Sequence, residues 1–182
     1  MRAVLDTCVL YPPILREILI GVARAGAFVP IWSDRILDEW CGVARSDGPA
    51  NEALVGGEIA LLRAHFPDSE YKIHEADNSD LYLPDTGDIH VLALARTAQC
   101  DAIVTANLKD FPNRDLAPHG VSAIHPDAFL CSLCTVAPSA IGDVVQQVLA
   151  QARDMSGQDI AARALLKRAR LPRLAKLLAQ AQ

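Results

Sequence analysis

Five acidic side chains have types and positions that could do chemistry, and four of them could together hold a metal ion. Two of them, Asp85 and Asp88, open a predicted helix after Pro84. On a helix stepped at about 100° per residue, Asp88 lies within roughly 60° of Val91 and Leu92 and faces the protein body. A carboxylate in that position must be paired, hydrogen-bonded or bound to a cation. Either the two acids only cap the helix, or Asp88 joins other acids at a site.

Two further acids follow predicted strands. Asp6 comes directly after the apolar run Ala-Val-Leu at residues 3–5, and Asp110 lies in the polar loop after a later apolar run. Ligands of open α/β sheets bind beyond the carboxyl ends of the strands, so both acids are placed for a site. A turn or cap aspartate is the alternative for Asp6. Oxygen ligands or hydrogen bonds at the same end could come from Thr105 and Asn107.

Glu39 is the fifth acid, and it comes from a helix predicted over residues 34–44 with Ser33 as its N-cap. It lies about 40° past one edge of the apolar stripe of this helix, whereas Asp38 faces nearly the opposite way. Of these two adjacent acids, only Glu39 can readily reach inward. Taken alone, it would be an ordinary residue at the boundary of the stripe.

Carboxylates gathered in one cleft repel and raise one another's pKa values. A group of four, Asp6, Glu39, Asp88 and Asp110, persists most easily if it holds Mg²⁺ or Mn²⁺. The chemistry that this predicts is phosphodiester hydrolysis by metal-bound water. No Ser/His/Asp set, Cys/His set or glycine-rich phosphate loop is evident in the sequence. The phosphatase motif Asp-x-Asp-x-Thr is also missing, because Cys8 and Leu10 occupy its later positions.

Length and composition predict a globular protein of the cytoplasm. With 182 residues, 51% of them hydrophobic, the chain can form one substantial core with an appendage, or two small domains. No apolar run approaches the ~18 residues that span a bilayer, and the start lacks the apolar stretch of a signal peptide. The five cysteines are an odd number, which suits reduced thiols better than a disulfide framework.

The net charge of −5 is unevenly placed along the chain. Residues 154–182 hold six Lys or Arg against two Asp, a charge of +4, so residues 1–153 carry −9. This distribution excludes a uniformly basic nucleic-acid binder. It does not exclude nucleic acid, since divalent cations and a local basic tail can both attract phosphate.

Strands that alternate with helices predict an α/β fold with a mostly parallel sheet. The predicted strands lie at residues 3–5, 28–32, within 71–82, at 101–105 and at 120–124. Between the second and third, the pair Gly56-Gly57 weakens an amphipathic stretch by about 1 kcal/mol per glycine, which predicts a broken or less stable helix pair. Helices beginning at Pro138 and Pro172 form a predicted appendage. Its leucines need the domain, another protomer or a partner to cover them.

Four motifs in order resemble those of PIN-domain ribonucleases, particularly the bacterial VapC-like toxins. They are Leu5-Asp6-Thr7-Cys8-Val9-Leu10-Tyr11, Ile36-Leu37-Asp38-Glu39-Trp40, Leu83-Pro84-Asp85-Thr86-Gly87-Asp88-Ile89-His90-Val91-Leu92-Ala93 and Val104-Thr105-Ala106-Asn107-Leu108-Lys109-Asp110-Phe111. The resemblance implies a three-layer α/β/α fold around a parallel sheet of about five strands. We therefore predict a PIN-like nuclease domain at residues 1–135 and a helical extension at 136–182.

The resemblance also implies a function. It makes Asp6, Glu39 and Asp88 the core that binds Mg²⁺ or Mn²⁺, with Asp110 as a fourth acid in a loop that varies. The implied activity is endonucleolytic cleavage of RNA by the toxin of a type II toxin-antitoxin pair. The implied partners are the RNA, a protein antitoxin that occupies the acidic groove, and a second copy in a homodimer. Residues predicted to support the acids or position the substrate are Thr7, Asp85, Thr105 and Asn107.

Two alternative functions remain open. A catalytically degenerate PIN module would bind RNA or a protein partner and would bind no metal, which a titration with Mn²⁺ can detect. A hydrolase of small phosphoesters would cleave a generic chromogenic phosphate ester.

Overall fold

The computed structural model describes residues 1–74, 78 and 80–180. The chain forms two compact units. The first unit consists of Met1–Tyr11 and Phe28–Ile124, and the second of Pro12–Ala27 and His125–Gln182. The predicted division into domains 1–135 and 136–182 stays a prediction.

A five-stranded parallel sheet forms the centre of the first unit, with the order β3-β2-β1-β4-β5. The strands are β1 (Arg2–Leu5), β2 (Val29–Ser33), β3 (Glu70–Tyr71), β4 (Ala102–Val104) and β5 (Ser122–Ile124). In the central register, Val4 lies between Ile31 and Ile103. The apolar residues of β1 are fully buried, as in parallel strands that are covered on both faces. The predicted α/β fold with five parallel strands is confirmed; residues 75–77 and 79 of the predicted third strand and loop lie outside the described residues.

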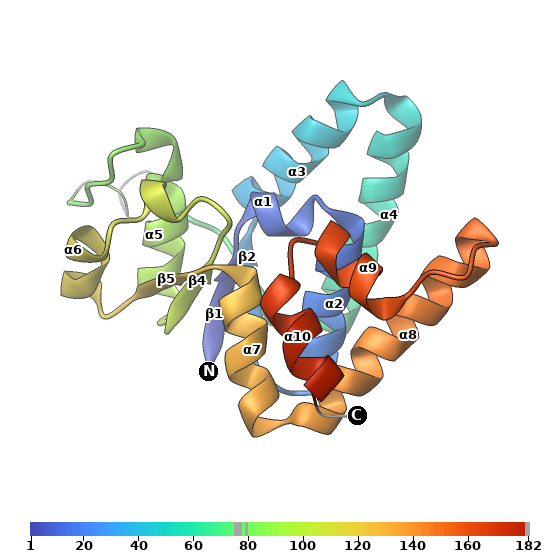
Figure 1. Ribbon diagram of the computed structural model, residues 1–182. Helices are drawn as coiled ribbons and strands as arrows, with labels where there is room; N and C mark the ends of the chain where they lie inside the picture. Colours follow the sequence, from blue (N-terminus) through green and yellow to red (C-terminus); the bar gives the residue numbers. More distant parts are fainter. Residues whose placement is uncertain (75–77, 79, 181–182) are drawn as a thin grey trace. The chain divides into compact units, whose positions relative to one another are not determined.

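Short connections and helices join these strands (Figure 1). The helices of the first unit are α1 (Thr7–Leu10), α3 (Asp34–Ser46), α4 (Pro49–His65), α5 (Ile89–Thr97) and α6 (Asn113–Leu116), and its 3₁₀ turns are η2 (Thr86–Asp88), η3 (Leu108–Asp110) and η4 (Ala117–His119). The Ser33 hydroxyl accepts the backbone N–H of Ile36 at 3.2 Å, which confirms the predicted cap of α3.

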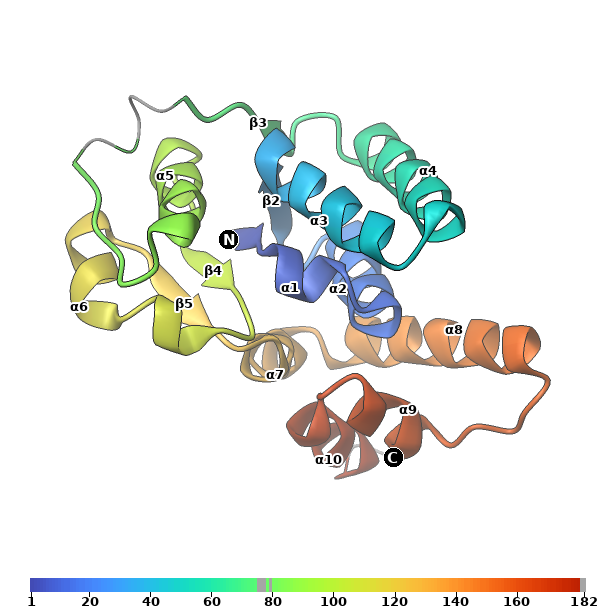
Figure 2. The same ribbon diagram turned by 90° about the horizontal axis from the view of Figure 1, so that it is seen from above.

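Helix α4 runs without a break from Pro49 to His65, so the predicted interruption at Gly56-Gly57 is wrong. Helices α3 and α4 lie side by side in both views (Figures 1 and 2). Two side chains of α4, Ile59 and Leu62, are buried. Burial of each contributes roughly 1.5–3 kcal/mol, which offsets the roughly 1 kcal/mol cost of each glycine in a helix.

The second unit is helical. The helices predicted to begin at Pro138 and Pro172 are confirmed. The members of this unit are α2 (Pro13–Arg24), α7 (Pro126–Val136), α8 (Pro138–Ser156), α9 (Ala162–Arg168) and α10 (Pro172–Gln180). Helix α2 packs on α8, and a Cβ on Gly21 would lie 2.6 Å from a Val144 methyl carbon. Glycine therefore permits the close approach of these two helices. No helix of the described residues is long and apolar enough to span a membrane.

The last helix is tied to α7 by a buried carboxylate. Asp127 is 3% exposed, and its two oxygens accept the backbone N–H groups of Arg173 and Leu174, each at 2.9 Å. These are donors that the first turn of α10 cannot satisfy by itself. A residue distant in sequence therefore caps α10 and fixes it within this unit.

Candidate active site

Asp6 is the most buried of the predicted site residues that carry a charge. Its backbone N–H donates to the carbonyl of Val104 at 3.2 Å, which continues the pairing of β1 with β4, and the residue is 7% exposed. The Thr105 hydroxyl donates to Oδ2 of Asp6 at 2.7 Å, and the Cys8 thiol donates to the same oxygen at 3.1 Å. A side chain directly after β4 and another from α1 therefore orient this carboxylate.

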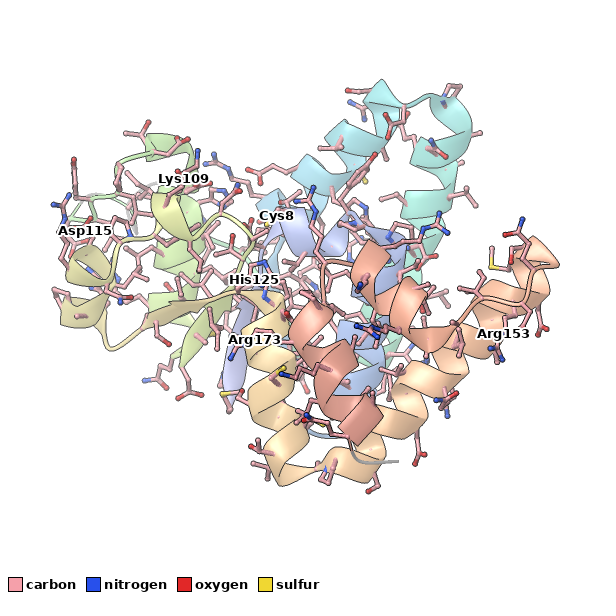
Figure 3. All side chains as sticks on the ribbon, viewed as in Figure 1. Cys8, Lys109, Asp115, His125, Arg153 and Arg173 are labelled. Carbon is pink, nitrogen blue, oxygen red and sulfur yellow. The ribbon has the colours of Figure 1, made fainter. Side chains whose placement is uncertain are left out.

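Cys8, labelled in Figure 3, links Asp6 to the loop after β4 by its hydrogen bonds. Its sulfur accepts the backbone N–H of Ala106 at 3.2 Å, and the Thr105 hydroxyl oxygen accepts that of Asn107 at 3.0 Å. Burial, together with the charge of Asp6, raises the pKa of the Cys8 thiol to about 11. The thiol therefore keeps its proton near neutral pH and remains a hydrogen-bond donor.

Asp88 ends the turn η2, immediately before α5, and is half-buried. Burial raises the pKa of Asp88 to about 6, and the negative charges of Asp6, Asp85 and Asp110 add to that rise, while His90 opposes it. Charge interactions of this kind weaken with distance. Asp6, at the end of β1, and Asp110, in the turn after β4, therefore lie near enough to Asp88 for their charges to act on its pKa.

Asp85 and Asp110 are the other two aspartates whose charges act on Asp88. The Asp85 Oδ1 accepts the backbone N–H of Gly87 at 2.8 Å, so the predicted capping role of Asp85 is confirmed for the turn η2. Asp110 lies in η3 with its side chain 21% exposed. The Nζ of Lys109 lies 3.9 Å from Oδ1 of Asp110 and points mainly into solvent (Figure 3). Such an exposed pair contributes little to stability.

Glu39 is placed differently from the aspartates, because nitrogen and hydroxyl donors surround it. The Thr7 hydroxyl donates to Oε2 at 3.0 Å, while Nε2 of His90 and Nε of Arg35 lie 3.0 and 3.2 Å from Oε1. Burial acts to raise the pKa of Glu39. The hydrogen bond and charge of His90, with the bonds from Thr7 and Arg35, outweigh burial and hold that pKa below its usual value.

Sequence reasoning missed His90 and Arg35. Arg35 precedes Glu39 by four residues on a helix, a spacing that signals an ion pair, and its Nη2 also donates to the Gly87 carbonyl at 3.2 Å. His90 is 2% exposed, and the other buried residues of α5 are all apolar. The available signal in the sequence was a histidine among apolar residues, two residues after Asp88. Only the folded structure shows that this side chain reaches Glu39 on α3.

A family model described as PIN domain matches residues 2–109. The match spans 108 of 182 residues and contains Asp6, Glu39 and Asp88. This chain belongs to the PIN-domain family. Asp110 comes directly after the matched segment.

A shorter stretch of the chain is similar to one named relative. A stretch of 43 residues is 51% identical to "Putative ribonuclease VapC50" of Mycobacterium tuberculosis (strain ATCC 25618 / H37Rv). The stretch covers 24% of this chain and 25% of that protein, so the chain spans about a quarter of the relative that it matches. No solved structure matches the chain.

PIN domains typically are nucleases and generally use divalent metal ions. The aspartates of this PIN domain offer the oxygen ligands that such ions prefer, and a cation would relieve the repulsion that adds to burial in raising the pKa of Asp88. However, within the described part of the chain no three His, Cys, Asp or Glu side chains are grouped so as to hold a metal ion. The residue types fit a divalent cation. The two oxygens of Glu39, however, are already occupied by Thr7, Arg35 and His90.

Proposed function

We propose that this PIN domain is an endoribonuclease that depends on Mg²⁺ or Mn²⁺ and acts in the cytoplasm. The main support is the surroundings of Asp88, where burial, together with the negative charges of Asp6, Asp85 and Asp110, raises the pKa to about 6. Membership of a family that typically contains nucleases supports the same function. An uncompensated group of carboxylates is costly, and a bound cation is the usual reason for keeping one.

In this proposal Asp6, Asp88 and Asp110 bind the cation, and Glu39 assists from α3. The bound ion supplies an activated water and stabilises negative charge on the attacked phosphate. Thr105 and Cys8 hold the Asp6 carboxylate in one orientation, and Thr7, with His90 and Arg35, holds Glu39. Asp88 is mostly ionised at pH 7, above its pKa of about 6, and takes up a proton at its carboxylate as the pH falls below that value.

RNA cleavage by purified protein tests this function. We expect cleavage with Mn²⁺ or Mg²⁺ and none with EDTA, and we expect Asp6→Asn to abolish it while the thermal midpoint is retained. Asp38→Asn is the matched control, because Asp38 is an exposed acid beside Glu39. Undiminished cleavage by Asp6→Asn would remove the aspartate group from the mechanism. Mapping of the cleaved ends then identifies the RNA site.

The toxin role is the finer part of the proposal. It is supported by the partial identity with the relative named VapC50 and by the VapC-like motifs around Asp6 and Asp88. We propose a protein antitoxin and a second copy of the chain as partners. Induction of the wild-type chain should arrest growth, whereas induction of Asp6→Asn should not. Normal growth with active, soluble protein would reject the toxin role but not the nuclease.

A catalytically degenerate PIN module is the second candidate. The observation in its favour is Glu39, whose two oxygens already accept bonds from Thr7, His90 and Arg35. Calorimetric titration with Mn²⁺ separates the two candidates. Heat of binding that disappears in Asp88→Asn supports the nuclease, and the absence of binding at millimolar Mn²⁺ supports the module.

A further inference from the structure

The positive side chains of this protein fall into two groups according to their partners. Eleven of the 17 Lys and Arg residues precede residue 154, and eight of these eleven pair with an Asp or Glu. Arg153, for example, lies 3.0 Å from Asp159. The remaining six form what we call the basic cluster: Arg163, Lys167, Arg168, Arg170, Arg173 and Lys176. All six are exposed, and within the described residues none pairs with a carboxylate.

The basic cluster lies on α9, α10 and their connection, which are held in place by buried leucines. Leu165 and Leu166 of α9 and Leu174 of α10 are at most 1% exposed, and α10 packs on α7 and α9. The buried Asp127 caps the first turn of α10, where Arg173 is located (Figure 3). The cluster is therefore arranged before any ligand arrives, which lowers the entropy lost on binding.

Arg170 has a backbone conformation that favours glycine. Its φ is 59°, and its N–H donates to the carbonyl of Lys167 at 3.0 Å in the connection between α9 and α10. A left-handed residue with a side chain is strained. Stability alone would favour glycine there, so an arginine at this position points to a use for its charge.

We propose that the basic cluster binds the phosphates of RNA at a second site, apart from the aspartate group. This inference rests on the proposed function. Residues 1–153 carry −9, and most of their positive side chains are already paired, so they offer a polyanion little attraction. Residues 138–182 contain no aromatic side chain on which a base could stack. Binding is therefore to the backbone, independent of base sequence and strongly dependent on salt.

An acidic protein segment is the other ligand that six cations could attract. A cavity of about 170 Å³ between α8, α9 and α10 is lined by Leu166 and Leu178 and edged by Arg163, and an apolar side chain of a partner could enter it. The need of the aspartate site for a polyanionic substrate favours RNA. The experiment below includes an acidic polypeptide for this reason.

The test is the affinity of the full chain for an unstructured 20-nucleotide RNA, measured by fluorescence anisotropy in EDTA at several KCl concentrations. The variant is Lys167→Gln with Arg168→Gln and Lys176→Gln. We expect at least tenfold weaker binding. Each phosphate contact to a single strand contributes about 0.7 to the salt slope, so loss of three contacts lowers the slope by about 2.

The matched control removes the same net charge from paired positions: Arg45→Gln with Arg63→Gln and Arg153→Gln. We expect its affinity to stay within about twofold of wild type. Equal losses in the two triple variants, or no loss in the first, would overturn the proposal. Poly-L-glutamate bound as tightly as RNA, with the same loss in the cluster variant, would also overturn it in favour of an acidic protein.

The measurement in EDTA separates this proposal from the nuclease itself. Cluster-dependent RNA binding by a chain that fails to cleave RNA would support the second site and reject the catalytic role of the aspartates. Metal-dependent cleavage together with unchanged RNA binding by the cluster variant would support the nuclease and reject the second site. Circular dichroism and thermal midpoints confirm that both triple variants are folded.

Discussion

Asp88 and Glu39 are both half-buried carboxylates of the first unit, yet their pKa values shift in opposite directions. Burial acts to raise the pKa of each residue. Around Asp88, the charges of Asp6, Asp85 and Asp110 add to that effect and the pKa reaches about 6. Around Glu39, donors from His90, Thr7 and Arg35 outweigh burial, and the pKa falls below its usual value.

The difference lies in the neighbours and not in the degree of burial. Glu39 is stabilised as an anion by the protein's own donors, so it gains little from a cation. Asp88 is surrounded by negative charge, so a divalent cation would relieve an existing penalty. We infer that metal affinity depends mainly on the aspartates, and that Glu39 tunes their surroundings. The predictions below test this ranking.

Loss of the Asp88 charge should have the largest effect. We expect Asp88→Asn to lower Mn²⁺-dependent RNA cleavage about 10³-fold, the scale of removing one essential charge-stabilising group. Glu39→Gln should cost about 10–100-fold, the usual effect of a residue that supports metal ligands. Both are measured as initial cleavage rates at saturating Mn²⁺ and pH 7.5.

Asp85→Asn is the control for this ranking. Asp85 also acts on the pKa of Asp88, but it is exposed, and an asparagine oxygen can still accept the Gly87 N–H. We expect a change of no more than about threefold, as for other exposed charges. A larger loss in Glu39→Gln than in Asp88→Asn would reverse the proposed order of the two carboxylates.

Removal of the His90 donor should make Glu39 resemble Asp88. In His90→Leu we expect the pKa of Glu39 to rise, because burial then acts with less opposition. We also expect Mn²⁺ affinity to increase, because a Glu39 carboxylate without this donor gains from a cation as Asp88 does. Carbon-detected NMR titration of the Glu39 carboxyl and calorimetry measure the two effects. His90→Gln restores a donor at similar reach and should bring both the pKa of Glu39 and the Mn²⁺ affinity back toward the wild-type values. Equal behaviour of the two variants would show that His90 only fills space.

Local sequence patterns were sufficient to predict most of the first unit. Asp6 follows a fully buried strand, and Ser33 caps the helix that carries Glu39, because strand periodicity and capping depend on near neighbours. The break at Gly56-Gly57 was a wrong prediction for the opposite reason. Packing of α4 on α3 offsets the cost of the glycines, and that packing is not written in the local sequence.

The site could be predicted only as a set of residues near one end of the sheet. The acids Asp6, Asp88 and Asp110 do interact, as their positions at strand ends and helix starts suggested. The orientation of Glu39 was not predictable, since its partner His90 lies 51 residues further along the chain. Hydrogen bonds between distant segments depend on the packing of whole helices. The roles of these residues in metal binding and catalysis stay predictions.

The smallest expected effect is the pH dependence of stability caused by Asp88. Its pKa of about 6 in the folded chain exceeds the ordinary value of 3.8, so the folded state favours the protonated form. Asp88 therefore supports folding fully below pH 3.8, and this support is lost as the pH rises through about 6.

An asparagine at this position does not titrate and should remove that pH dependence. In EDTA at pH 7.5, we expect Asp88→Asn to melt roughly 2–4 °C above wild type, the shift that about 1 kcal/mol produces in a chain of this size once solvent screening is allowed for. At pH 4 the two melting temperatures should agree more closely. Mn²⁺ at pH 7.5 should then raise the midpoint of wild type but not of Asp88→Asn, because only the ionised carboxylate gains from the cation. A wild type that melts above the variant in EDTA at pH 7.5 would mean that the negative charge of Asp88 is already compensated within the protein, as that of Glu39 is.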